Sequence, residues 1–222
     1  YTYDIPGLTM DQLNQIYVKE EWFLDKDNFR FDKKVLGYGI VKEYLRSPDS
    51  DRMERKVLFV LDFENDSSLG EVPDISKLEL IGSDLKYEFS LNEVESWVKD
   101  LDHDRLINVV MDKIISGEVK SYDFWNGNEL TINEVKNMLS IPNDTVMVED
   151  PETGEVKPEI IQYDVSPDLF HSYIFIEDWY LDRATYRIVK KVKGFAPVSF
   201  VYRDEESSEP ERKVTFMVKF NQ

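Results

Sequence analysis

The chain of 222 residues has no cysteine and only two histidines. Without cysteine it can form no disulfide and no zinc–thiolate site, and it has no thiolate nucleophile. Its longest uninterrupted apolar run is Val57 to Leu61. That run is far shorter than the roughly 20 residues of a membrane helix. The sequence therefore predicts a protein that does not span a membrane.

Positive charge is also scarce, with 27 Lys and Arg against 45 Asp and Glu, for a formal net charge of -18. Such a field repels phosphate backbones and anionic lipid headgroups, so nucleic acids and membrane surfaces are disfavoured as partners. Other proteins that present cationic patches fit this charge better. At 41% hydrophobic residues, the chain can still bury a substantial core.

The main positive feature is an internal repeat. The stretch from Tyr173 to Val198 repeats the stretch from Ile16 to Val41 without a gap. Identical or similar residues continue beyond these stretches and relate positions 16–63 to positions 173–220. Such self-similarity indicates a shared three-dimensional unit.

Each copy of the repeat has the pattern of β-strands. Branched and aromatic residues alternate with polar ones, which is typical of strands with one buried face. Polar turns follow Asp25 and Asp182, and longer acidic loops precede the last strand of each copy. We expect an α+β fold in which two similar three-stranded antiparallel β-meander units flank a small helical segment.

The middle of the chain contains helix signals instead. Capping boxes begin at Ser90 and Thr131, and a further helix is expected from Asp104 to just before Gly117. A β-hairpin fits residues 145–161. The expected organisation is a first meander unit over residues 1–66, a linker over 67–89, and a helical segment, hairpin and second meander over 90–222.

The residues that the repeat preserves are the candidate interaction residues. Two interpretations of its cations are open: they pair across the sheet with repeated acidic residues, or they form a subunit contact. The tryptophans are core packing or a sugar-stacking surface, and the glycines mark a bend, a close backbone approach or a binding position. The full set is Trp22, Asp25, Arg30, Lys33, Lys34, Gly37, Trp179, Asp182, Arg187, Lys190, Lys191 and Gly194.

Enzymatic and metal-binding patterns were sought and not found. His103 and His171 have no neighbouring triad or metal-ligand pattern. An EF-hand loop needs glycine at its sixth position and glutamate at its twelfth, and the acidic runs that start at Asp25 and Asp100 have neither. We therefore predict no catalytic residue, no metal ligand and no cofactor. A looser calcium site of oxygen ligands in the acidic loops is the alternative to a solvated acidic face. Because two converging carboxylates are invisible in a sequence, a carboxylate-based hydrolase remains an alternative.

Two segments resemble the gliding-motility-associated GldN family, also called PorN. The first runs from Trp179 to Val198, with a tryptophan and an aromatic residue before an Asp turn, then a basic strand and a Gly-Phe-Ala-Pro stretch. The second, from Leu106 to Asp123, is a helix followed by glycine and Tyr-Asp. They occur in the family's order, and the similarity covers roughly residues 90–222.

The resemblance implies a non-enzymatic periplasmic subunit of the type IX secretion and gliding machinery of Bacteroidetes. Family members assemble with an outer-membrane lipoprotein into large rings, so the implied partners are such a lipoprotein and further copies of the chain. The first residue is Tyr1 and not Met, so we expect a product whose signal peptide has been removed. The family has a single meander, so the doubled one here is a departure. A carbohydrate or surface-polymer binding module is the alternative function.

Overall fold

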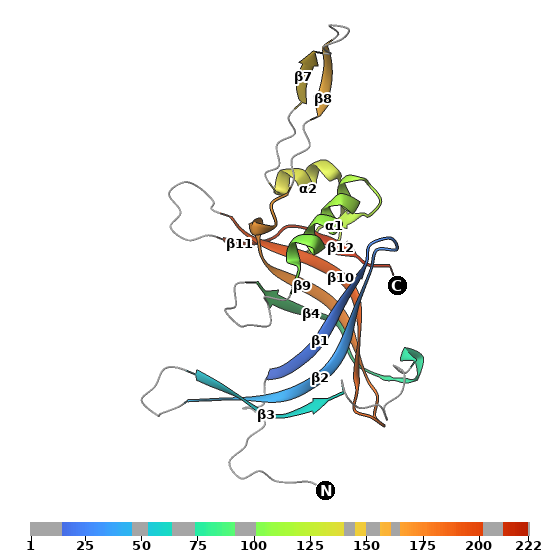
Figure 1. Cartoon of the computed structure of the whole chain (residues 1–222), viewed down its shortest axis with the longest axis vertical. Coiled ribbons are helices and arrows are strands. Elements are labelled where there is room, and N and C mark those ends of the chain that lie inside the picture. Colours follow the sequence, from blue (N-terminus) through green and yellow to red (C-terminus); the bar gives the residue numbers. More distant parts are fainter. Residues whose placement is uncertain are drawn as a thin grey trace. The chain divides into compact units, whose positions relative to one another are not determined.

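The computed structural model describes residues 15–45, 53–63, 74–91, 101–139, 145–149, 156–160, 165–201 and 211–221. Antiparallel strands dominate these residues and two α-helices accompany them, which confirms the predicted α+β class (Figure 1). The elements are β1 (Gln15–Asp25), β2 (Arg30–Leu45), β3 (Met53–Asp62), β4 (Glu79–Ser90), α1 (His103–Ile115), β5 (Ser121–Tyr122), β6 (Glu129–Leu130), α2 (Ile132–Met138), β7 (Thr145–Glu149), β8 (Val156–Ile160), β9 (Phe170–Leu181), β10 (Ile188–Val201), β11 (Glu211–Val214) and β12 (Met217–Lys219).

The chain divides into two compact units, each drawing on distant parts of the sequence. The predicted linker, where it is described, holds a short 3-10 helix at Ile75–Lys77 and most of strand β4. The domain boundaries expected at residues 66 and 90 stay a prediction. Unit 1 comprises Tyr1–Phe23, Phe31–Ser83 and Asp178–Lys191, and unit 2 comprises Leu24–Arg30, Asp84–Glu177 and Val192–Gln222.

In unit 1, the strands β1 and β2 run side by side (Figure 1). Strand β2 also pairs with β3, from Gly37 opposite Asp62 to Leu45 opposite Met53, with a β-bulge near Val41. Side chains in the first half of β2 alternate between buried and exposed, as the period of two predicts. Its buried face is therefore set by the sequence pattern.

The second copy of the repeat pairs its strands in the same register as the first. Gly194 lies opposite Lys219, as Gly37 lies opposite Asp62 at the matched positions. Strand β10 continues through Pro197. The strand paired with it is interrupted, because β11 ends at Val214 and β12 begins at Met217. Between them, the Thr215 N–H donates to the Pro197 carbonyl oxygen. The duplication of the complete meander unit stays a prediction.

The core of unit 2 contains one face of α1 and buried aromatic residues of β9 and β10, among them Phe175 and Phe195. The Asp102 carboxylate caps α1 by accepting from the Arg105 N–H, and Gly117, with a φ of 75°, follows its end. The rings of Phe175 and Phe195 pack with centroids 5.5 Å apart, and both residues are fully buried. This helix is the one predicted from Asp104 to before Gly117, so that prediction is confirmed.

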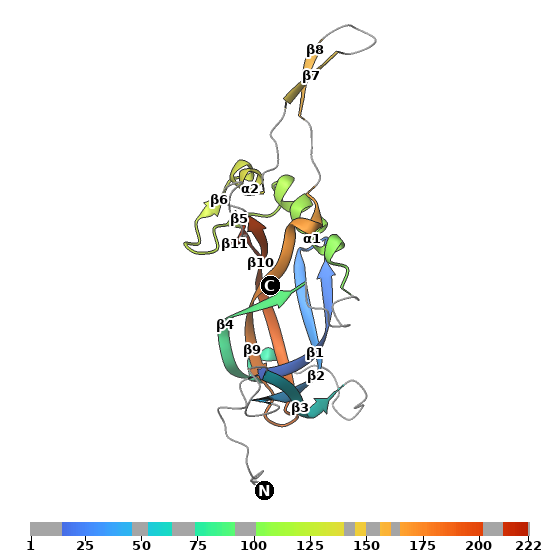
Figure 2. The ribbon, with the colours of Figure 1, turned by 90° about the vertical axis from the view of Figure 1, so that its left-hand side faces the viewer.

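Two further elements match their sequence signals. The Thr131 and Glu134 side chains form the predicted capping box at the start of α2. Strands β7 and β8 form the predicted hairpin, from Thr145 opposite Ile160 to Glu149 opposite Val156 (Figure 2). The helix expected after Ser90 lies mostly at positions 92–100, outside the described residues. Neither described helix is both long and apolar enough to cross a membrane.

Candidate functional site

The preserved aspartates anchor the tight turns between strands. The Asp25 carboxylate accepts from the backbone N–H groups of Asp27 and Asn28, each at 3.1 Å, and from the Asn28 side chain at 2.8 Å. These bonds, led by the one from the Asn28 side chain, hold the pKa of Asp25 below its ordinary value. The turn closes at Phe29, which takes a left-handed conformation with a φ of 48°. Asp25 is therefore a turn-forming residue.

The turn in the second copy has the same construction. The Asp182 carboxylate accepts from the Thr185 hydroxyl at 2.7 Å and from the Ala184 N–H at 2.9 Å. The bond from Thr185, the stronger influence, lowers the pKa of Asp182. Tyr186 takes the left-handed position with a φ of 57°. An aromatic residue at this position is uncommon, and both copies have one.

A third turn of this kind, absent from the sequence prediction, follows β5. The Asp123 carboxylate accepts from the N–H groups of Trp125 and Asn126, each at 2.9 Å. Gly127 fills the left-handed position with a φ of 73°. This turn presents the Trp125 side chain, which is 75% exposed. The signal that could have located it is the Asp-x-x-Asn-Gly sequence from Asp123 to Gly127, because aspartate, asparagine and glycine favour tight turns.

The central feature of unit 1 is a pair of buried lysines. Strands β2 and β10 place Lys33 directly opposite Lys190, and these residues occupy matched positions of the repeat. Their side chains are 0% and 2% exposed. The Lys33 Nζ lies 4.5 Å from the centroid of the Trp22 ring, and the Lys190 Nζ lies 4.3 Å from that of Trp179. Each copy thus forms the same cation–π contact.

The Glu20 carboxylate contacts both lysines. The Lys190 ammonium donates to Glu20 Oε2 at 2.7 Å, and the Lys33 Nζ lies 3.5 Å from Glu20 Oε1. The Trp22 indole N–H also donates to Glu20 Oε1, at 2.7 Å. We call Glu20, Trp22, Lys33, Trp179 and Lys190 the lysine–tryptophan cluster.

Burial and charge act in opposite directions on the Glu20 carboxyl. Burial raises its pKa, but the nearby charges of Lys33 and Lys190 and the bonds that it accepts outweigh burial, so its pKa is lowered. Glu20 is therefore ionised at neutral pH and cannot supply a proton there as a general acid would. The geometry favours a structural role for the cluster, in which a buried ion pair joins matched strands.

These contacts decide between several interpretations of the cluster residues. Lys33 and Lys190 are buried within the chain, so their ammonium groups are not available for a subunit contact. The Lys33 ammonium lies against one face of the Trp22 ring, and the Lys190 ammonium lies against one face of the Trp179 ring. Those faces are therefore not open for stacking on a sugar. The carbohydrate-binding alternative therefore has no support here.

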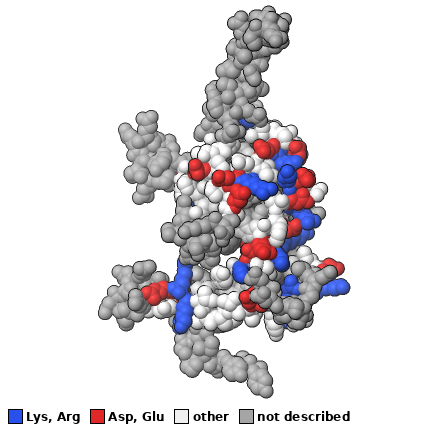
Figure 3. Space-filling model, viewed as in Figure 1, with Lys and Arg blue, Asp and Glu red and all other residues white. Residues whose placement is uncertain are grey.

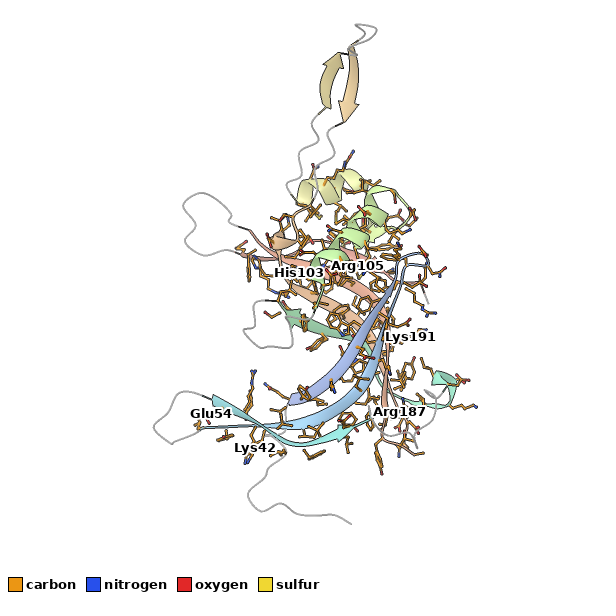
Figure 4. All side chains as sticks on the ribbon, viewed as in Figure 1. Lys42, Glu54, His103, Arg105, Arg187 and Lys191 are labelled. Carbon is orange, nitrogen blue, oxygen red and sulfur yellow. The ribbon has the colours of Figure 1, made fainter. Side chains whose placement is uncertain are left out.

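The remaining preserved residues do not join the cluster. Lys34 points to the other face of β2, where its Nζ lies 3.5 Å from a Glu21 carboxylate oxygen and both side chains are about half exposed. Arg30 is exposed at the start of β2, whereas Arg187 is 9% exposed and Lys191 is partly buried. Figure 4 shows Arg187 and Lys191 at the beginning of β10.

The preserved glycines allow the backbones of paired strands to approach closely. A Cβ atom on Gly37 would lie 2.6 Å from the Leu61 carbonyl oxygen, and one on Gly194 would lie 3.0 Å from that of Val218. Both distances are shorter than ordinary van der Waals contact. The glycines are therefore required by backbone packing, which is one of the alternatives drawn from the sequence.

A shallow pocket of about 340 Å³ lies in unit 2 between α1, β12 and the Asp25 turn. Each of its lysines has a partner. Lys113 pairs with Glu118, Lys120 donates to Glu129 at 2.8 Å, and the Lys219 Nζ lies 4.2 Å from the centroid of the Tyr122 ring. The hydrogen bond from Lys113 is the main cause of a lowered pKa of Glu118. A catalytic acid needs a raised pKa, so Glu118 does not have that profile. Among the described residues, no group of three or more acidic or histidine side chains could hold a metal.

One interpretation of the sequence paired the repeated cations across the sheet with repeated acids, of which Glu20 is one, and Glu20 does contact Lys33 and Lys190. The strand pattern could not show that the β2 and β10 copies face each other. The available signal was a pair of matched lysines together with a pair of matched acids, Glu20 and Glu177.

Comparison with known families gives one finding. A family model described as Gliding motility associated protein GldN matches residues 88–222. This range contains α1, the Asp123 turn and the strands β9 to β12, but not β1 to β3. No curated protein matches the chain.

Proposed function

Because this chain belongs to the GldN family of gliding-motility-associated proteins, we propose that it is a non-enzymatic subunit of the type IX secretion and gliding machinery. In this role it lies in the periplasm and binds other proteins, among them an outer-membrane lipoprotein and further copies of itself. The family match over residues 88–222 is the observation that carries the proposal.

The described surface supports a protein partner. Lys and Arg are interspersed with Asp and Glu on the face that Figure 3 shows. Trp125 projects from the Asp123 turn, directly after the family's helix and Tyr-Asp segment, and its ring packs edge-on against Phe124. Exposed tryptophans held on rigid turns are frequent energetic centres of protein interfaces. We assign Trp125 as the anchor for the partner.

The repeat supports a scaffolding role. Both copies have the same strand register, the same turn and the same lysine–tryptophan contact. We propose that the chain carries two copies of one meander unit, the second belonging to the family region. A duplicated sheet adds surface for assembly and needs no reactive group.

Binding to an outer-membrane lipoprotein from the same organism tests the proposal. The full chain and that lipoprotein are mixed and analysed by size-exclusion chromatography with light scattering. We expect a complex, and we expect Trp125→Ala to weaken it at least about tenfold, since such anchors commonly contribute 2 kcal/mol or more. The matched control is Phe23→Ala, which removes another exposed aromatic residue that lies outside the family region.

Two results would overturn the proposal. One is the absence of a complex between the unmodified proteins, and the other is recovery of the native protein in the cytoplasmic fraction after cell fractionation. Equal weakening by Phe23→Ala and Trp125→Ala would refute Trp125 as the anchor and leave the complex itself established.

A further inference from the structure

The β3 strand exposes an apolar edge. Its run from Val57 to Leu61 pairs with β2 on one side, and β2 is its one partner among the described strands. Phe59 and its neighbour Val60 point to opposite faces of the strand, yet they are 51% and 48% exposed. In Figure 3 the surface over β2 and β3 is mainly uncharged, with charged side chains at its margins.

Edge strands are normally protected from pairing with other chains. Charged side chains, prolines and irregular backbone provide that protection. Strand β4 has such features, because Asp84 takes a left-handed conformation with a φ of 53° and Lys86 lies in its second half. The charged residues of β3 (Glu54, Arg55, Lys56 and Asp62) lie outside the run from Val57 to Leu61, which includes no charge and no proline. Its edge is therefore suited to accept another strand.

In the second copy of the repeat, the edge that corresponds to the exposed edge of β3 pairs with another strand. Its matched strand β12 pairs on its outer edge with β5, with Met217 opposite Tyr122 and Val218 opposite Ser121. Met217 is 8% exposed and Val218 is fully buried. The same edge in the first copy has equivalent apolar side chains without a described strand against them.

We propose that β3 pairs antiparallel with β3 of a second copy of this chain, about a twofold axis at Phe59. The sequence from Lys56 to Asp62 is a cation, five apolar residues and an anion. In the proposed register, Lys56 of each copy lies opposite Asp62 of the other, and Val57 lies opposite Leu61. A twofold interface requires such self-complementarity, and cross-strand pairs of opposite charge stabilise it.

The bulge near Leu58 determines the extent of this pairing. A bulge increases the local twist of a strand, so we expect a short ladder between two copies and not a continuing sheet. A short ladder buries little surface, so we expect weak association that depends on concentration. The inference does not depend on the proposed function, because β3 lies outside the family region at residues 88–222.

Charge exchange at the ends of the run tests the register. Light scattering of the full chain over about 1–200 μM should show a monomer–dimer equilibrium. Lys56→Asp alone places two pairs of acids across the interface, and Asp62→Lys alone places two pairs of lysines there. Each should weaken dimerisation about tenfold, whereas the double variant should restore it, because opposite charges face each other again.

The absence of native cysteine permits an independent test. Residues directly opposite in an antiparallel pair have Cα atoms about 4.5–5.5 Å apart, which is within the range of a disulfide. Phe59→Cys lies on the proposed axis and should form a covalent dimer under mild oxidation. Phe23→Cys, at a similarly exposed aromatic position on β1, is the control and should remain monomeric.

A wild-type chain that stays monomeric at 200 μM, about the top of the range tested, overturns the proposal and indicates another occupant of the edge. Failure of the double variant to restore a dimer that both single variants weaken refutes the register. If neither single variant weakens the dimer, the dimer forms through a different surface. Circular dichroism of each variant separates these results from a loss of folding.

Discussion

The third strands of the two repeat copies have matching sequences and opposite environments. Phe59 in the first copy is 51% exposed, whereas its counterpart Phe216 in the second is fully buried. The register against the middle strand is the same in both. Pairing along the repeat is thus encoded locally, but burial depends on what covers the strand, and in the second copy β5 pairs beside it.

We expect the largest difference in stability between the alanine variants of these two phenylalanines. We expect Phe216→Ala to lower the free energy of unfolding by about 3–5 kcal/mol, because it removes a fully buried ring and leaves a cavity. The matched Phe59→Ala should change it by less than about 1 kcal/mol in the dilute monomer. Urea unfolding of both variants measures the difference. Similar losses would show that Phe59 is covered in solution.

The charged residues of the first copy allow the same comparison. Glu20→Gln removes the carboxylate between two buried lysines and should destabilise the fold by about 3 kcal/mol, near the lower end for breaking a buried ion pair. Glu21→Gln removes the half-exposed partner of Lys34 and should cost no more than about 0.5 kcal/mol. Chemical denaturation at pH 7 checks both. An equal loss of unfolding free energy in Glu20→Gln and Glu21→Gln would mean that the lysine–tryptophan cluster is solvated.

The matched glycines provide a finer comparison. Gly37→Ala would place a Cβ atom 2.6 Å from the Leu61 carbonyl oxygen, and Gly194→Ala one 3.0 Å from that of Val218. We expect a loss of about 1–3 kcal/mol for Gly37→Ala, from strand displacement, and a smaller loss for Gly194→Ala. Thermal unfolding measures the order, and the reverse order would contradict the close approach at Gly37.

The smallest expected effect is a dependence of stability on pH. The pKa of Glu20 is lower in the folded chain than its ordinary value of 4.5. Its contribution is therefore complete above about pH 4.5 and is lost as the pH falls through the lowered folded value. Unfolding measured from pH 7 to 3 should show a steeper loss for the wild type than for Glu20→Gln. Parallel curves would contradict an ionised Glu20 in the cluster.

Local signals predicted the two described helices and the turns at Asp25 and Asp182, but not the turn at Asp123. The capping box at Thr131 and the glycine at position 117 predicted α2 and the end of α1, because both act through neighbouring backbone groups. Strand β4 was not recognised, and its positions were assigned to a linker. Its apolar residues, such as Leu80 and Tyr87, are exposed, and it is ordered by pairing with β9. That pairing has no local signature.

By itself, the sequence determined the strands of the repeat, the aspartate turns between them and the glycines at their crossings, since each depends on alternation or on bonds within a few residues. Only the tertiary structure decided that Lys33 and Lys190 meet, that Glu20 lies between them, and that one third strand is covered while the other is exposed. These outcomes depend on the strand that each edge meets, and the partners come from positions far apart in the chain.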